Sequence, residues 1–371
     1  MTGVGALDGI VTLRELEPLA RARMDPAAWD YVAGGAWDER SLLENDAAWS
    51  RYRLLPRVLV DVSRVDPATT LLGRSVAMPV AIAPMAAHAL AHADAEAATA
   101  RAAASAGVPF ILSTMSSRSI EAVAQAAPDG DRLFQLYVQR DPAASRGLVE
   151  RAAAAGYRAI VLTVDLPVLG YRERDLRNSW QLDVPLGNFA AGSPSHADHG
   201  HGARGESGYE ALEQQREVGL AWDDVETIRG WSGLPIVLKG ILRPDDARRA
   251  VEHGADGIVV SNHGARQLDR TPAPIDVLGE IVEAVGDRAE IWVDGGVRRG
   301  LDVVTALALG ARGVLVGRPV LWGLTAGGET GAARVLEILR EELVTAMTLL
   351  GAPTPAEVSR DLVRPAGDFG R

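Results

Sequence analysis

The sequence predicts an α/β protein built as a (β/α)₈ TIM barrel with an N-terminal helical segment and a long loop after the fourth strand. Eight short apolar runs alternate with segments of helical periodicity between about residues 77 and 350. The runs are short and without polar alternation, which is typical of strands buried on both faces. A doubly wound open sheet is the rival architecture, but no Gly-x-Gly-x-x-Gly follows the first strand. We therefore expect residues 1–371 to form one domain, because barrels routinely exceed the usual length of about 150 residues per domain.

Each element is expected from local pattern. Short helices should occupy residues 12–50, one beginning at Asp25-Pro26 and broken at Gly34-Gly35. The expected barrel strands are 80–84, 108–113, 133–138, 159–164, 235–239, 257–260, 290–293 and 313–316. The expected helices are 94–106, 120–127, 142–155, 244–253, 275–285, 300–309 and 329–349.

Polar side chains stand where the expected strands end. Barrel enzymes place their active sites at the carboxyl ends of the strands, so these side chains should surround one ligand. His263 and Arg266 follow the strand 257–260, one able to take a proton and the other to bind a carboxylate. The other residues at or near the strand ends are Ala86, Ser113, Gln135, Tyr137, Thr163, Asp165, Lys239, Ser261, Asp294, Gly317 and Arg318, most of them polar.

Two glycine-arginine loops predict a phosphate site. Gly296 and Arg298 follow the seventh strand, and Gly317 and Arg318 follow the eighth. Glycines let backbone N–H groups approach an anion and arginine supplies the opposite charge, in the loops where barrels often bind phosphate. Lys239 ends an apolar strand, where it either stabilises negative charge on a bound group or forms a structural ion pair.

The insertion at about 171–222 is the least regular segment. Its histidines 196, 199 and 201 have no carboxylate or cysteine framework beside them, so we expect no metal site. A long loop at a barrel mouth is more typical of a lid. Tyr209 is its one aromatic residue placed to cover a small substrate.

The amino-acid composition argues against several classes of partner and of chemistry. The chain has a net charge of −11, which gives it no general attraction to nucleic acid or to anionic membranes. It has no cysteine, which excludes disulfides and cysteine nucleophiles. Neither a signal-peptide pattern nor an apolar run of about 18 residues is found, so we expect a cytoplasmic protein without a membrane span.

The run Ser261-Asn262-His263-Gly264-Ala265-Arg266-Gln267-Leu268-Asp269 resembles the signature of the FMN-dependent α-hydroxy acid oxidases and dehydrogenases. The resemblance extends from about residue 12 to 350, and the segments 34–36, 43–46 and 83–92 look most like the lactate oxidases of that family. It implies FMN contacts at Ala86, Ser113, Gln135, Thr163, Lys239, Ser261, Asp294, Gly296, Arg298, Gly317 and Arg318. It implies a substrate site of Tyr31, Tyr137, Arg172, His263 and Arg266, with Asp165 as the partner of the catalytic histidine.

The resemblance implies an oxidase that converts an L-2-hydroxy acid to the 2-keto acid and passes electrons to O₂, giving hydrogen peroxide. A dehydrogenase with another acceptor and a monooxygenase that decarboxylates its product stay open as alternatives. A non-enzymatic scaffold is disfavoured by the complete set of polar residues, and a metal-dependent aldolase-type barrel by the shortage of clustered ligands. Met115 stands where relatives often have an aromatic residue in the substrate pocket, which favours lactate or a larger acid. The family also implies a homotetramer.

Overall fold

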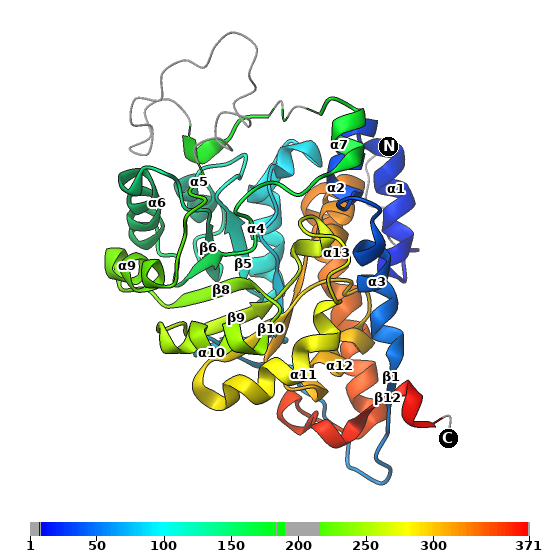
Figure 1. Ribbon diagram of the computed structural model, residues 1–371. Coiled ribbons are helices and arrows are strands. Elements are labelled where there is room, and N and C mark those ends of the chain that lie inside the picture. Colours follow the sequence, from blue (N-terminus) through cyan, green and yellow to red (C-terminus); the bar gives the residue numbers. More distant parts are fainter. Residues whose placement is uncertain (1–6, 8, 181, 183, 190–215, 370–371) are drawn as a thin grey trace.

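A closed barrel of parallel strands forms the centre of the computed structural model, which describes residues 7, 9–180, 182, 184–189 and 216–369 (Figure 1). The strand order is β10-β11-β4-β5-β6-β7-β8-β9, and β11 closes the barrel on β4 by pairing Val314 with Val80. The strands are β4 (Val80–Ile82), β5 (Phe110–Ser113), β6 (Arg132–Leu136), β7 (Ile160–Thr163), β8 (Ile236–Ile241), β9 (Gly257–Val260), β10 (Glu290–Val293) and β11 (Gly313–Val316). The predicted (β/α)₈ barrel is thereby confirmed.

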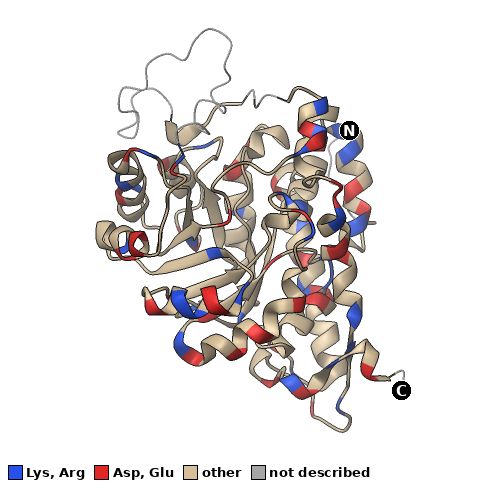
Figure 2. Ribbon diagram, viewed as in Figure 1, with Lys and Arg blue, Asp and Glu red and all other residues tan. Residues whose placement is uncertain are grey.

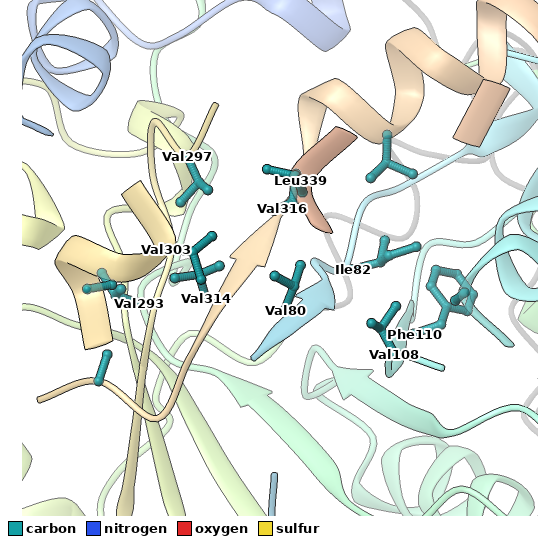
Figure 3. Close-up of a cluster of buried hydrophobic side chains, with 14 of the residues drawn as sticks. Val80, Ile82, Val108, Phe110, Val293, Val297, Val303, Val314, Val316 and Leu339 are labelled. Carbon is teal, nitrogen blue, oxygen red and sulfur yellow. The ribbon is translucent and has the colours of Figure 1, made fainter. Parts of the chain in front are cut away.

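Helices surround the barrel and bury its outer surface. They are α4 (Ala95–Ala106), α5 (Ile120–Ala126), α6 (Pro142–Ala154), α9 (Asp223–Ser232), α10 (Pro244–Glu252), α11 (Pro274–Val285), α12 (Gly300–Ala308) and α13 (Arg318–Leu350). Figure 3 shows part of the layer between strands and helices, where Val80 and Val314 of the strands lie near Val303 of α12 and Leu339 of α13. Branched side chains fill this layer because both faces of each strand are buried.

The barrel interior is packed, so any ligand must bind at its mouth. Inward-facing Ile111, Val161 and Trp292 belong to one buried cluster. Leu71, from a hairpin of β2 (Thr69–Leu71) and β3 (Arg74–Val76), joins the cluster at the end where the strands begin. Only the opposite end, where the strands finish, is left to form a site.

The N-terminal segment folds into short helices beside the barrel. They are η1 (Leu13–Glu15), α1 (Leu16–Arg23), α2 (Pro26–Ala33), α3 (Arg40–Ala47) and η2 (Ala48–Arg51). Helix α2 begins as expected, because the Asp25 carboxylate accepts hydrogen bonds from the N–H groups of Ala27 and Ala28. Gly34 follows its last residue, as predicted.

Smaller elements complete the chain. Strand β1 (Tyr52–Leu54) pairs antiparallel with β12 (Val363–Pro365) beside the barrel (Figure 1). The other short helices are η3 (His88–Leu90), α7 (Glu173–Arg177), η4 (Gly187–Phe189), η5 (His263–Ala265), η6 (Gly286–Arg288), η7 (Pro355–Glu357), η8 (Arg360–Leu362) and η9 (Ala366–Phe369).

The last helix differs from the sequence prediction. Helix α13 begins at Arg318, directly after β11, whereas residue 329 was expected. Gly327 and Gly328 leave helical geometry, which a sequence pattern presents as a helix start, but the helix continues on both sides of them. Helix α9 and the three-residue strands β1, β2, β3 and β12 were also not predicted, since such short strands carry too little periodicity.

Charged residues are concentrated on the surrounding helices and loops, whereas the barrel strands are nearly free of them (Figure 2). None of the helices in the described part of the chain combines the length and the apolar character needed to cross a bilayer.

Candidate active site

A cavity opens at the carboxyl ends of the barrel strands. Its lining carries six cationic side chains and, among described residues, one carboxylate, that of Asp294. The cations are Arg172, Arg216, Lys239, Arg266, Arg298 and Arg318. Because the whole chain is negative, this concentration of positive charge is local and indicates a site for anions.

His263 lies between a carboxylate and a phenol. Its Nδ1 is 2.8 Å from Asp165 Oδ1, and its Nε2 is 3.3 Å from the Tyr137 hydroxyl. The three residues follow three different strands, β9, β7 and β6. With Asp165 accepting from Nδ1–H, Nε2 is left as the basic nitrogen, directed at the cavity side where Tyr137 lies.

The loop after β9 holds His263 in an uncommon backbone conformation. His263, Gly264 and Ala265 all have positive φ, at 60°, 62° and 62°. Ser261 Oγ accepts from the His263 N–H, and Asn262 Oδ1 accepts from the Ala265 N–H. Such strain in non-glycine residues persists only where the surroundings enforce it, and it is concentrated at functional sites.

The pKa shifts of this pair favour a neutral imidazole beside an ionised carboxylate. Burial lowers the pKa of His263 below its usual value, and the attraction of Asp165 offsets this only in part. Burial would raise the pKa of Asp165, but its interaction with His263 and the charge of Lys239 bring it below its usual value. His263 is thus prepared to accept a proton.

Lys239 is buried in β8, which continues to Ile241, two residues beyond the predicted strand end. Its Nζ donates to Ser261 Oγ at 2.8 Å and lies 3.0 Å from Asp294 Oδ2. The structural ion pair is therefore present, and the ammonium also lines the cavity. The second oxygen of Asp294, Oδ1, is buried without a hydrogen-bond partner among the described residues. A buried carboxylate oxygen of this kind is costly unless a ligand donates to it.

Buried arginines repel one another in the cavity. Burial, together with the charges of Arg266, Arg298 and Arg172, lowers the pKa of Arg318 to about 9. Burial also lowers the pKa of Arg298, whose guanidinium lies 5.0 Å from the centre of the Trp322 ring. An anion bound among these groups would remove the repulsion.

Arg318 also has a role that the sequence did not indicate. Its guanidinium donates to the carbonyl oxygens of Val32, Gly34 and Gly264. It therefore connects the end of α2 to the loop that carries His263.

Arg172, Arg266 and Tyr31 form a second cationic group in the cavity. Arg172 Nε donates to the Arg266 carbonyl at 3.3 Å. The Arg266 guanidinium donates to the Tyr31 carbonyl at 2.5 Å and lies 4.9 Å from the centre of the Tyr31 ring. Trp180 stacks on the same Tyr31 ring, with 5.4 Å between the ring centroids. Neighbouring guanidinium groups of this kind suit a carboxylate.

The other predicted residues lie in or directly behind the cavity wall. Ala86, Ser113, Met115, Thr163, Gly296 and Gly317 line it. Gln135, Ser261 and Asp165 are not among the lining residues. Gln135 lies behind the wall, donating to Thr163 Oγ1 and accepting from Ser113 Oγ. Tyr209 and the three histidines of the insertion lie outside the described residues.

Sequence patterns missed several residues of the site. Arg216 lines the cavity with its guanidinium 4.6 Å from the centre of the Tyr137 ring. Asn45 exchanges two 2.8 Å hydrogen bonds with Asn262, and Trp49 Nε1 donates to the Gly295 carbonyl. These contacts join the N-terminal helices to both site loops, and no local pattern signals them. Within the described residues, no group of three or more potential metal ligands occurs.

A barrel whose mouth combines a histidine-carboxylate pair with a cluster of buried arginines defines an enzyme that acts on an anion with an anionic cofactor. In sequence, residues 20–365 match the family model of the FMN-dependent dehydrogenases. The chain belongs to this family, as the sequence resemblance predicted.

Individual relatives are similar in sequence to this chain over nearly its full length. An L-lactate oxidase of Nostoc sp. is 50% identical over 352 residues, which is 93% of this chain and 96% of that protein. The 2-hydroxyacid oxidase 1 of Mus musculus is 45% identical over 96% of this chain and 97% of its own length. The structure of a mandelate oxidase with benzoyl-formic acid is 43% identical, with a TM-score of 0.86 over 96% of this chain and 98% of that one.

FMN is the cofactor of this family, and the cavity suits it. An anion such as a phosphate monoester would offset the mutual repulsion of the buried arginines. A hydrogen-bond donor such as a sugar hydroxyl would satisfy Asp294 Oδ1. Both features are met by one flavin mononucleotide.

Proposed function

We propose that this chain is an (S)-2-hydroxy-acid oxidase that converts a lactate-like or larger 2-hydroxy acid to the 2-keto acid. The observation that carries the proposal is the placement of His263, paired with Asp165, in the same cavity as Arg172 and Arg266. A proton acceptor and a carboxylate-binding pair are the two groups that a 2-hydroxy acid requires. FMN, when bound, supplies a two-electron acceptor that dioxygen reoxidises with release of hydrogen peroxide.

Different side chains bind the substrate and transfer its proton. Arg172 and Arg266 bind the substrate carboxylate, and the Tyr31 hydroxyl assists them. Tyr137 hydrogen-bonds the substrate oxygen. His263 Nε2 takes a proton, and Asp165 keeps the imidazole in the required tautomer and stabilises its charged form. Met115, buried beside the cavity, contacts the substrate side chain.

The loops after β10 and β11 would hold the phosphate of the cofactor. We assign the phosphate to Gly296, Arg298, Gly317 and Arg318, and the sugar hydroxyls to Asp294. Lys239 would stabilise negative charge on the flavin ring. Ala86, Ser113, Gln135, Thr163 and Ser261 complete the contacts or support them.

Anaerobic mixing of the enzyme with 2-hydroxy acids tests the function. We expect lactate to bleach the flavin absorbance, and air to restore it with one hydrogen peroxide formed per 2-keto acid. Reoxidation by a quinone but not by air would indicate a dehydrogenase. Release of carbon dioxide in place of the keto acid would indicate the monooxygenase.

Substrate choice follows from the small and flexible residues of the pocket. Ala86 leaves space beside the cofactor, and Met115 adapts to irregular apolar groups. We expect kcat/KM for lactate to exceed that for glycolate, with 2-hydroxybutyrate, 2-hydroxyoctanoate and mandelate also accepted. Differences between neighbouring acids should be about 1–3 kcal/mol per methylene. A preference for glycolate in this series would contradict the assignment of Met115.

The pH dependence follows from the lowered pKa of His263. Because its neutral form takes the proton, flavin reduction should be constant at pH 7 and above. The rate should decline only when the pH falls below 6.5, the usual imidazole pKa, since burial moves the transition of His263 to lower pH. Stopped-flow reduction at saturating substrate between about pH 4 and pH 9 measures this. A half-maximal rate at or above pH 7 would contradict a neutral, buried base.

We also propose that the chain acts as one catalytic domain, in the cytoplasm and as a homotetramer. Hydrogen bonds of Asn45 and Trp49 to the site loops support a single unit. Light scattering of the holoenzyme should give about four times the chain mass of 39.2 kDa. A monomer mass over a wide concentration range would reject the assembly.

A further inference from the structure

Gly240 is an extra residue in strand β8, directly after Lys239. Lys239 pairs with Val259 and Ile241 with Val260, so Gly240 has no opposite residue in β9. Its φ is +112°, a conformation that residues with a side chain rarely adopt. Bulges of this type occur beside active sites, where they redirect neighbouring side chains.

The carboxyl group of Asp165 packs directly against this glycine. A β-carbon on Gly240 would lie 2.5 Å from Asp165 Cγ, 2.6 Å from its Cβ and 2.9 Å from its Oδ2. All three distances are shorter than real contacts, and the obstructing atoms are the short, rigid side chain of Asp165. The strand pairing Thr163–Lys239 and the 2.9 Å hydrogen bond from the Val164 N–H to the Lys239 carbonyl fix β7 at this distance.

The position of Asp165 in turn determines the orientation of His263. Asp165 Oδ1 is the acceptor for His263 Nδ1 at 2.8 Å. The backbone on both sides of Gly240 is held by the parallel pairing of β8, with β7 up to Lys239 and with β9 at Lys239 and Ile241. On the N-terminal side, Lys239 is held by Ser261 and Asp294. The three heavy atoms nearest to an added β-carbon all belong to the side chain of Asp165, so this carbon would displace Asp165.

We propose that Gly240 is a positioning residue for the reaction: its missing β-carbon is the space that Asp165 occupies while it orients His263. The inference rests on the proposed function, since it assigns Gly240 a role in proton transfer. It predicts that a side chain at position 240 slows flavin reduction by displacing Asp165, and that the variant still binds the cofactor.

The test compares Gly240→Ala with wild type as purified holoenzymes. A displacement of catalytic groups by about 1 Å costs on the order of 10²-fold in rate, so we expect flavin reduction to slow by about 10- to 100-fold. The substrate KM should change by less than about threefold, because the arginines that bind the carboxylate are untouched. Gly254→Ala is the matched control: its φ is +83°, and its nearest neighbour, Arg229, is at an ordinary 3.7 Å. It should reduce at the wild-type rate.

A double-mutant cycle with Asp165→Gly separates this role from general disruption. Gly240→Ala should slow reduction by less than about threefold once the Asp165 side chain is absent, because residues that act as one unit are not additive. A crystal structure of Gly240→Ala should show Asp165 Oδ1 moved out of hydrogen-bond distance of His263 Nδ1. If Gly240→Ala fails to fold, Asp165→Gly/Gly240→Ala should restore the folded holoenzyme.

Additive losses in the cycle, an unmoved Asp165 or a failure of the double variant to fold would each overturn the inference. Wild-type reduction in Gly240→Ala would do the same while leaving the oxidase assignment intact. If wild type itself is not reduced by any 2-hydroxy acid, the proposed function fails. The crystal structure still tests the placement of Asp165 in that case.

Discussion

His263→Ala is expected to keep FMN bound and to slow flavin reduction by about 10²- to 10⁴-fold, the usual contribution of a general base. No other described imidazole lines the cavity or contacts Asp165, so no neighbour can replace it. FMN should remain bound because the arginines and Asp294 are unchanged. Single-turnover mixing with saturating lactate measures the reduction rate, and the flavin absorbance of the purified protein measures retention.

His253→Ala is the matched control for this experiment. His253 lies after α10, outside the cavity, and stacks on Trp222 at 5.7 Å between ring centroids. Its loss should leave reduction at the wild-type rate. Normal reduction in His263→Ala would refute the role of this residue, and equal losses in both variants would show that the effect is not specific to the site.

Arg172→Met is expected to reduce kcat/KM for lactate by about 30- to 5000-fold. This corresponds to the roughly 2–5 kcal/mol lost when one member of a buried charge pair is removed. Methionine preserves much of the side-chain volume, so the loss reports mainly on charge. For lactamide, which has no carboxylate, kcat/KM should be low in wild type and change little in the variant.

Arg177→Met controls for the removal of a positive charge from the same segment. Arg177 is an exposed residue of α7 that pairs with Glu173. The substitution should leave kcat/KM unchanged for both lactate and lactamide. Equal losses for lactate and lactamide in Arg172→Met would show that Arg172 supports the fold of the site and does not select the carboxylate.

The sequence predicted the barrel well because its signals are local. Strands β9, β10 and β11 have the predicted bounds, since short branched runs between glycines and polar turns leave no competing structure. Helices α2, α6 and α10 each begin at a proline, which is favoured in the first helical turn. In helix α13 the break signal of Gly327-Gly328 corresponds to a real kink, and the prediction missed only the helical residues between Arg318 and this kink.

The site was predicted where residues follow strands directly and missed where distant segments meet. His263, Asp165 and Lys239 were predicted because strand ends in a barrel converge on one face. Arg216 and Asn45 reach the cavity region from a long insertion and from an N-terminal helix, and neither location carries a local pattern. Gly240 lies one residue past the predicted strand 235–239, and its importance depends on the closeness of Asp165. The catalytic and binding roles themselves stay predictions until the variants are measured.

The amide pair of Asn45 and Asn262 has a consequence for the synthesis of the chain. The partners are 217 residues apart, so α3 leaves the ribosome long before its partner exists. At a synthesis rate of about 5–20 residues per second, the interval is roughly 10 to 40 s. During this time the N-terminal helices have neither the loop after β9 nor the loop after β10 to dock on. Arg318, the last residue assigned to the FMN phosphate, follows later still, directly after β11. We therefore expect the chain to retain FMN only after β11 and Arg318 have been synthesised.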